Sequence, residues 1–264
     1  ATHTRYLHSI GVMNVATMAF EKIFHHYPMG DDLLRLKETL RLAALLHDIG
    51  HAPLSHSTES VMPSVSKLNL DPAYIGASTN RQATHEDYTI LSITNSSFAE
   101  AFKGVSEQYG VSKERVADLI IGSTTDPGYF VINKINYFPL LHQLISSEMD
   151  CDRMDYLLRD SYFCGVSYGK YDLPWILDNL EACPIGDQCY LGISERAVST
   201  FDDFLLSRFH MFLMVYFHYR AVCLEKMLES YFATEKDEYS IPANIEEYLN
   251  HDDHLLLKTL NHNF

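Results

Sequence analysis

The stretch LLHDIGHAPLSH, residues 45–56, places His47, Asp48, His51 and His56 at the end of an apolar run. The periodicity of residues 33–48 predicts a helix whose inward stripe comprises Leu36, Leu40, Ala43, Ala44 and His47. Gly50 and Pro53 predict that this helix stops just after the stripe. Polar side chains at the inner end of a core helix need partners, so this stretch predicts a buried site.

Two more predicted helices carry a polar residue on an apolar face. Residues 5–26 are apolar on more than one face, and His8 falls on the stripe of Val12 and Val15. Residues 139–163 predict a single helix on which Asp152 shares a face with Ile145, Met149 and Tyr156. An unpaired carboxylate on such a face would cost several kcal/mol. Asp152 is therefore expected to have a partner.

Two imidazoles and two carboxylates converging from three helices predict a divalent-metal site with mixed nitrogen and oxygen ligands. The candidate ligands are His8, His47, Asp48 and Asp152. Taken singly, each residue has another interpretation: a hydrogen-bonded core histidine, an aspartate at a helix end, or a carboxylate paired with a buried arginine. The coincidence of all of them, with His51 and His56 in the next turn, favours the metal.

The rest of the chain predicts mostly helix and a minor β element. Thr84 and Asp87 form a capping-box pattern that predicts a helix from His85, whereas residues 60–83 lack periodicity and predict a long loop. Residues 183–193 alternate around Gly186-Asp187 and predict a small hairpin. Thr200 and Asp203 are expected to cap a long helix. The fold class is therefore all-α with a small β-hairpin near 183–193, as one domain spanning 1–264.

Composition limits the function classes. The formal net charge is −15, from 20 Lys and Arg against 35 Asp and Glu, which disfavours a nucleic-acid partner because such partners require clustered cations. No apolar run approaches the roughly 18 residues of a membrane span, and no signal peptide is visible. Five cysteines without a CxxC pair indicate reduced thiols and a cytoplasmic protein. The first residue is Ala, so we expect the native chain to begin earlier.

The motifs HS at 8–9, LLHDIGHAPLSH at 45–56, THED at 84–87 and MDCDRMDYLLRD at 149–160 resemble the HD-domain phosphohydrolases. Within that superfamily, the sequence is most similar to the deoxynucleoside-triphosphate triphosphohydrolase (dGTPase-like) branch. The resemblance runs from TRYLHSIGV to beyond SRFHMFLMVYFHYR at 207–220. It implies an all-α HD fold and chains longer than this one at both ends. Neither HDxxED nor a Gly-Tyr-Pro motif, which mark two other HD branches, occurs in the sequence.

The resemblance implies hydrolysis of a dNTP to deoxynucleoside and inorganic triphosphate, with metal-activated water attacking the α-phosphorus. The implied metal ligands are again His8, His47, Asp48 and Asp152, and the cofactor is a divalent ion such as Mg, Mn, Fe, Zn or Ni. Candidate general acids are His51, His56 and His85, with Glu59 orienting one of them. Relatives can carry an aspartate where Glu59 stands. The implied substrate-binding residues are Arg5, Arg153 and Arg208 for phosphates, Tyr156 and Asp160 for the sugar, and Tyr216 beside the base.

Other functions stay open at this point. The chain could be an HD phosphohydrolase acting on a nucleoside monophosphate or another phosphoester, or a nucleotide-binding regulatory module with weak catalysis. A Cys-His hydrolase gains little, because Cys151 has carboxylate neighbours that would raise the pKa of its thiol. The family resemblance also implies a homo-oligomer and leaves room for regulatory nucleotides.

Overall fold

The structure is a computed structural model that describes residues 3–76, 80–234 and 239–262. Its first helix, α1 (Arg5–Ile23), begins the core. The side chain of Thr4 accepts a hydrogen bond from the Leu7 amide at 3.3 Å and caps the helix. His8, Val12, Ala16 and Phe20 are buried on α1, so the inward placement of His8 is confirmed. The helix ends at Ile23, three residues before the predicted end at 26.

The chain divides into two compact units. Unit 1 comprises residues 1–46 and 104–218, and unit 2 comprises residues 47–103 and 219–264. The helices of unit 1 are α1, α2 (Asp31–Leu46), α6 (Lys113–Ile121), α7 (Phe138–Ile145), α8 (Cys151–Phe163), α9 (Leu173–Asp178) and α10 (Val198–Met211), and α5 (Phe102–Tyr109) begins at the boundary. The helices of unit 2 are α3 (Pro72–Ile75), α4 (His85–Asn95), α11 (Tyr219–Thr234), α12 (Ile245–Tyr248) and α13 (Asp253–His262).

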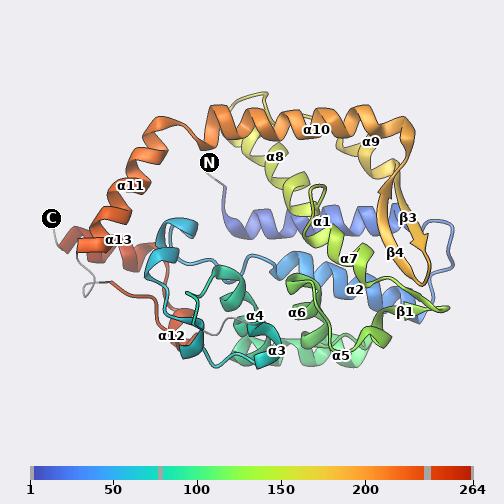
Figure 1. Cartoon of the computed structure of the whole chain (residues 1–264), viewed down its shortest axis with the longest axis horizontal. Coiled ribbons are helices and arrows are strands. Elements are labelled where there is room, and N and C mark those ends of the chain that lie inside the picture. The colour runs from blue at the N-terminus through green and yellow to red at the C-terminus, as the bar shows by residue number, and fades with distance from the viewer. Residues whose placement is uncertain (1–2, 77–79, 235–238, 263–264) are drawn as a thin grey trace. The chain divides into compact units, whose positions relative to one another are not determined.

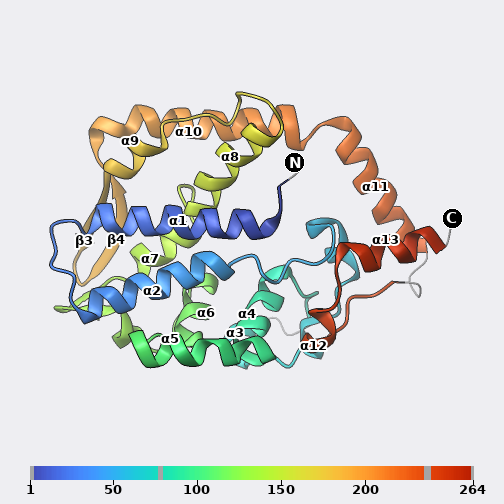
Figure 2. The ribbon, with the colours of Figure 1, turned by 180° about the vertical axis from the view of Figure 1, so that it is seen from behind.

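In unit 1, α1 packs against α2 and α8. Figures 1 and 2 show α1 and α2 side by side and running in opposite directions. Leu36, Leu40, Ala43 and Ala44 of α2 are fully buried, as the stripe predicted. Because two helices joined by a short connection run antiparallel, the end of α2 at Leu46 returns to the level of the first turns of α1, where His8 lies.

Unit 1 also holds a four-stranded sheet in the order β1-β2-β4-β3. The predicted hairpin is β3 (Leu180–Ile185) and β4 (Gln188–Ile193), which turns at Gly186 with φ 65°. Strands β1 (Val131–Ile132) and β2 (Ile135–Asn136) are not predicted by the sequence. Their turn uses Asn133 and Lys134 at φ 51° and 69°, without the glycine that usually marks a tight hairpin. The fold class, all-α with a small β element, is confirmed.

The single helix predicted over 139–163 is wrong, since α7 ends at Ile145 and α8 begins at Cys151. Asp150 separates them, because its carboxylate accepts hydrogen bonds from the amides of Ser147 at 3.0 Å and Arg153 at 2.8 Å and caps α8. Ile145 and Met149 therefore share no helix with Asp152. Within α8 the spacing of Asp152, Tyr156 and Asp160 still places the three on one face.

Two predicted helix starts, at His85 and near Thr200, have different outcomes. The capping box at Thr84 and Asp87 is present and α4 begins at His85, as predicted. Helix α10 begins at Val198 after a 3₁₀ turn, Glu195–Ala197, so the expected cap by Thr200 and Asp203 is wrong. The helix continues into a π-helical stretch, Phe212–Tyr216. Residues 60–83 include 3₁₀ helix Val65–Lys67 and α3, with 77–79 outside the described residues. The single-domain organisation stays a prediction.

All five cysteines are unpaired, as expected, and Cys151 is fully buried. Burial, followed by the charges of Asp150 and Asp152, holds the pKa of the Cys151 thiol well above its usual range. A thiol in this state is a poor nucleophile. Among the described residues, no helix combines the length and apolar character needed to cross a membrane.

Candidate metal centre and acid–base cluster

In unit 1, the imidazole of His8 lies between two carboxylates of α8. Its Nε2 is 2.9 Å from Asp152 Oδ1, and its Nδ1 is 2.8 Å from Asp155 Oδ2. Burial lowers the pKa of His8, but the hydrogen bonds and charges of Asp152 and Asp155 outweigh burial and raise it to about 9. Positive charge is therefore stabilised at this place, between one imidazole and two carboxylates.

Asp155 is the buried carboxylate of α8, and the sequence interpretation missed it. Its side chain is 9% exposed, whereas that of Asp152 is 31% exposed, so Asp152 lies at the edge of the buried face. Arg159 holds Asp155 through Nε at 2.7 Å and Nη2 at 2.8 Å. Although burial raises the pKa of Asp155, its hydrogen bonds with Arg159 and His8 lower it below its usual range. The i, i+4 spacing of Asp155 and Arg159 was the available sequence signal.

A glycine allows this ion pair to approach α1. A Cβ atom at Gly11 would lie 2.0 Å from Asp155 Oδ1 and 2.3 Å from Arg159 Nη2. Such contacts are too short for any side chain. Gly11, one turn after His8, is thus the position where Asp155 and Arg159 pack across α1.

In unit 2, His47 and Asp48 follow directly after α2 in a turn. His47 Nε2 lies 3.4 Å from Asp48 Oδ1, and His51 Nε2 lies 3.5 Å from the same oxygen. The side chains of His47, Asp48 and His51 are only 10%, 18% and 5% exposed. The turn therefore gathers three largely enclosed side chains with the nitrogen and oxygen atoms that divalent metals bind.

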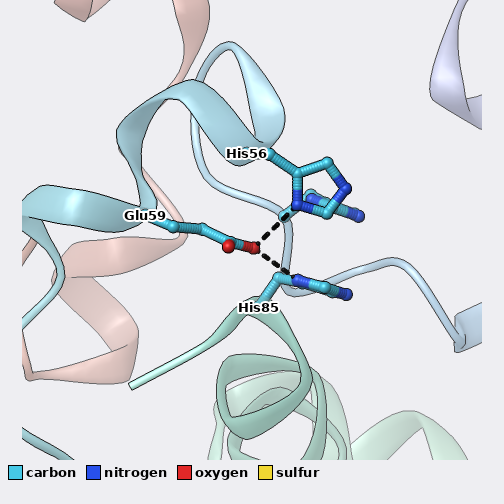
Figure 3. Close-up of side chains that lie close together, drawn as sticks. His56, Glu59 and His85 are labelled. Atoms are coloured by element: carbon cyan, nitrogen blue, oxygen red, sulfur yellow. Dashed lines mark hydrogen bonds and ion pairs between the residues drawn. The ribbon is translucent and has the colours of Figure 1, made fainter. Parts of the chain in front are cut away.

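Unit 2 also brings together all four predicted acid–base residues. Glu59 Oε1 is 3.0 Å from His56 Nδ1 and 2.6 Å from His85 Nδ1 (Figure 3). The ring of His51 stacks on that of His85, with centroids 4.0 Å apart and planes 5° apart. His51, His56, Glu59 and His85 offer ligand atoms within 4.8 Å of one another, so this group could itself hold a metal ion.

The carboxylate of Glu59 is ionised at neutral pH. Burial raises the pKa of Glu59, but hydrogen bonds to His85 and His56 outweigh burial and lower it below its usual range. Figure 3 shows the Glu59 carboxylate pointing between the two rings, which extend away from it on the same side. One carboxylate thus orients two imidazoles, where the sequence predicted that it would orient one.

The predicted sugar and base residues lie together in unit 1. Tyr216 donates a hydrogen bond to Asp160 Oδ2 at 2.7 Å, and the rings of Tyr156 and Tyr216 meet edge to face at 6.2 Å. Burial and the charge of Asp152 raise the pKa of Tyr156 to about 12, so its ring stays neutral. His3 Nε2 contacts Asp160 Oδ1 at 2.6 Å, and no sequence signal pointed to this histidine.

Two of the three predicted phosphate-binding arginines form ion pairs in unit 1. Arg153 pairs with Asp150 and also donates to the Ser147 carbonyl. Arg208 donates to Glu148 Oε2 at 2.5 Å and lies over the ring of Phe212 at 5.7 Å. Arg5 is the first residue of α1 and is exposed. Their roles in phosphate binding stay predictions.

Comparisons with known proteins give one family. A sequence model of the HD domain family matches residues 5–160. The uncharacterized protein YwfO of Bacillus subtilis is 34% identical over 83% of this chain and 41% of its own length. A Dictyostelium discoideum homolog of the deoxynucleoside triphosphate triphosphohydrolase SAMHD1 is 26% identical over 97% of this chain and 45% of its own length.

Among solved structures, a hypothetical protein from Aquifex aeolicus is similar with a TM-score of 0.70 and 28% identity, over 97% of this chain and 58% of that one. This chain covers 41% and 45% of the two curated relatives named above. The matched range includes His8, the turn at His47 and Asp48, the cluster around Glu59, and Asp152. Since that range is more than half of the 264 residues, the chain belongs to the HD domain family.

Proposed function

We propose that this chain is a metal-dependent phosphohydrolase that cleaves a dNTP to deoxynucleoside and inorganic triphosphate. The observation that carries the proposal is the order of residues along one face of α8. Asp152, a metal-ligand candidate beside His8, is followed one turn later by Tyr156 and two turns later by Asp160, which contacts Tyr216. The residues proposed to contact the metal and the sugar would thus lie one after another along a single face of α8, beside the residue proposed to contact the base. The similarity to a relative named as a dNTP triphosphohydrolase supports this substrate class.

The metal ligands in this proposal are His8 and Asp152 of unit 1 and His47 and Asp48, which open unit 2. The donors fit a divalent cation, because His8 Nε2 and Asp152 Oδ1 face one another at 2.9 Å and offer one imidazole nitrogen and one carboxylate oxygen. Asp155 would accept a hydrogen bond from His8 Nδ1–H, as a carboxylate commonly does at a histidine that binds a metal.

A bound divalent cation would lower the pKa of a coordinated water and draw charge from the phosphoryl oxygens. In the reaction, the water gives up a proton to solvent, its oxygen forms a bond to the α-phosphorus, and the bond from phosphorus to the 5′-oxygen breaks. The leaving 5′-oxygen takes a proton, which His56 or His85 donates in this proposal. Glu59 keeps its charge and holds the ring of each donor through Nδ1. Arg153 and Arg208 would exchange Asp150 and Glu148 for the triphosphate, and Arg5 would pair with it as well.

A product assay tests this function. The metal-loaded protein is incubated with each dNTP, each NTP and each nucleoside monophosphate, and the products are separated by chromatography. The proposal predicts deoxynucleoside and intact triphosphate from dNTPs. Release of orthophosphate from monophosphates would support another phosphoester substrate, and tight nucleotide binding without products would support a regulatory module.

The Asp155 carboxylate, which contacts His8 Nδ1, gives a prediction about the metal. Asp155→Asn and Gly11→Ala should each lower metal affinity by about 10–100-fold, as loss of an outer-shell partner typically does. The first removes the charge that holds His8, and the second places a methyl group 2.0 Å from Asp155 Oδ1. Metal affinity is measured by competition with a chelator. Gly30→Ala is the matched control, because its Cβ would meet nothing within 4 Å. Unchanged affinity in both test variants would remove Asp155 from the metal's surroundings.

The sugar cluster gives a second prediction. Tyr156→Ala should relax the preference for deoxyribose, because the ring is proposed to fill the space of a 2′-hydroxyl. Asp160→Ala should weaken the binding of all dNTPs by about 1–3 kcal/mol, since a buried hydrogen bond to the 3′-hydroxyl is lost. The ratio of kcat/KM for dGTP and GTP measures the first effect, and the value of kcat/KM for each dNTP measures the second. An unchanged ratio in an active Tyr156→Ala variant would place the selection elsewhere.

The oligomeric state and regulatory nucleotides remain part of the proposal. Light scattering of the protein with and without dNTPs measures both, because a regulatory nucleotide bound between copies would shift the mass. A mass equal to one chain under all conditions would contradict the expected homo-oligomer.

A further inference from the structure

The turn His47–His51 carries three proposed site residues without belonging to a helix or a strand. Within the turn, the His51 amide donates to the Asp48 carbonyl at 3.2 Å. The directions of His47, Asp48 and His51 depend on the backbone conformation of this turn. Two neighbouring elements of unit 2, α4 and α12, bond to its backbone.

Thr89 of α4 bonds to this turn twice. Its hydroxyl donates to the His47 carbonyl at 3.1 Å and accepts from the Gly50 amide at 3.0 Å. A threonine or serine within a helix commonly bonds the carbonyl four residues earlier, and Ser92 of the same helix does so at 2.7 Å to Tyr88. Thr89 is fully buried and uses its donor and acceptor on the turn instead.

Tyr248 of α12 provides the third bond. Its hydroxyl donates to the Gly50 carbonyl at 2.7 Å, and its ring stacks on Tyr88 of α4 with centroids 4.2 Å apart. The residue is 4% exposed. Tyr248 and Gly50 are 198 positions apart, so the C-terminal part of unit 2 contacts the motif turn directly.

Because Gly50 has no side chain, the turn packs directly against the backbone of α4. A Cβ atom there would lie 2.1 Å from the Thr89 amide nitrogen and 2.2 Å from the His85 carbonyl oxygen. Both are backbone atoms, which cannot move aside as a flexible side chain can. The turn and the first two turns of α4, which also carry His85, therefore form one packed body.

We infer that Thr89 and Tyr248 are positioning residues that hold the His47–His51 turn in the conformation that binds metal. They contact neither the metal nor the substrate in this proposal. They fix the His47 carbonyl and both backbone polar groups of Gly50, and hence the directions of the side chains between them. The inference rests on the proposed metal ligands His47 and Asp48, and it makes α12 a structural part of the metal centre.

The test compares removal of these hydroxyls with removal of matched hydroxyls nearby. Thr89→Val and Tyr248→Phe each delete the bonds to the turn and keep the size of the side chain. Ser92→Ala and Tyr88→Phe are the controls, because Ser92 bonds its own helix and the Tyr88 hydroxyl bonds the Pro242 carbonyl at 2.8 Å. Each full-length variant is measured for thermal unfolding, for Co²⁺ affinity and absorption spectrum, and for kcat and KM.

We expect both test variants to lose about 10–100-fold in Co²⁺ affinity and to show an altered Co²⁺ spectrum, as changes around metal ligands do. The controls should lose comparable thermal stability and keep both metal properties. Thr89→Ser retains the hydroxyl and should restore the affinity, which keeps the inference testable if Thr89→Val does not fold. Equal losses of metal affinity in test and control variants, or none in either test variant, would overturn it.

The outcome is separable from that of the proposed function. Co²⁺ affinity is read without any nucleotide. If the protein hydrolyses no dNTP but Thr89→Val and Tyr248→Phe still lose metal selectively, the positioning role stands and the dNTP substrate does not. If dNTPs are hydrolysed and neither substitution changes the metal affinity, the dNTP substrate stands and the positioning role does not.

Discussion

Asp152→Asn is expected to give a folded chain that retains no metal and hydrolyses no nucleotide. Asp152 Oδ1 lies 2.9 Å from His8 Nε2, so its carboxylate and that imidazole face one another. Asparagine keeps the shape of the side chain but removes the charge that balances a dication, and a neutral amide is a weak ligand for such a metal. Elemental analysis of the purified variant measures the metal, and circular dichroism measures the helix content.

Asp160→Asn is the matched control for this substitution. It makes the same chemical change two turns further along α8, where the carboxylate contacts Tyr216 and His3. We expect it to keep its metal and to lose only nucleotide affinity. Full metal content in Asp152→Asn would show that Asp152 is not a ligand, and equal metal loss in both variants would point to disruption of α8.

The second large effect concerns the cluster around Glu59. His56→Ala and His85→Ala should keep the metal and lower kcat by about 10²–10⁴-fold, the range typical of general acid–base groups. Glu59→Gln should also lower kcat, because it removes the charge that orients both rings through Oε1. Stopped assays over a range of dNTP concentrations separate kcat from KM, and elemental analysis records the metal.

His25→Ala is the control here. Its ring is exposed, and its Nδ1 contacts the Lys22 carbonyl at 2.6 Å in unit 1, away from any residue with a proposed role. It should leave kcat unchanged. Because His51, His56, Glu59 and His85 could hold an ion, the metal content decides between two roles. A variant that came out metal-free would make its histidine a ligand and not a proton donor.

Local patterns in the sequence were enough to predict several elements. The stripe of α2, the inward placement of His8 and the capping box at Thr84 each depend on residues within one or two turns of each other. The hairpin at Gly186 is of the same kind, because a glycine marks the left-handed backbone of its turn. The motif around His47 indicated the HD family, and the family match over residues 5–160 confirms it.

The prediction of one helix over residues 139–163 was wrong because a polar capping residue interrupts the apolar pattern. The apolar spacing through Ile145 and Met149 suggested one helix, but Asp150 caps a new one by accepting from two backbone amides. A single capping residue outweighs a few apolar positions, because it satisfies amides that a helix start leaves unbonded. Consequently Asp155, rather than Asp152, is the deeply buried carboxylate of α8.

Contacts between distant parts of the chain were decided by tertiary structure alone. The sequence determined which residues could bind a metal or move a proton, since those capacities belong to side-chain chemistry. It gave no sign that Asp155 holds His8 across 147 positions or that Tyr248 bonds Gly50 across 198. Such pairs have no fixed spacing along the chain, because their meeting depends on how whole helices pack. The candidate ligands are therefore a property of the sequence, and the partners that orient them are a property of the fold.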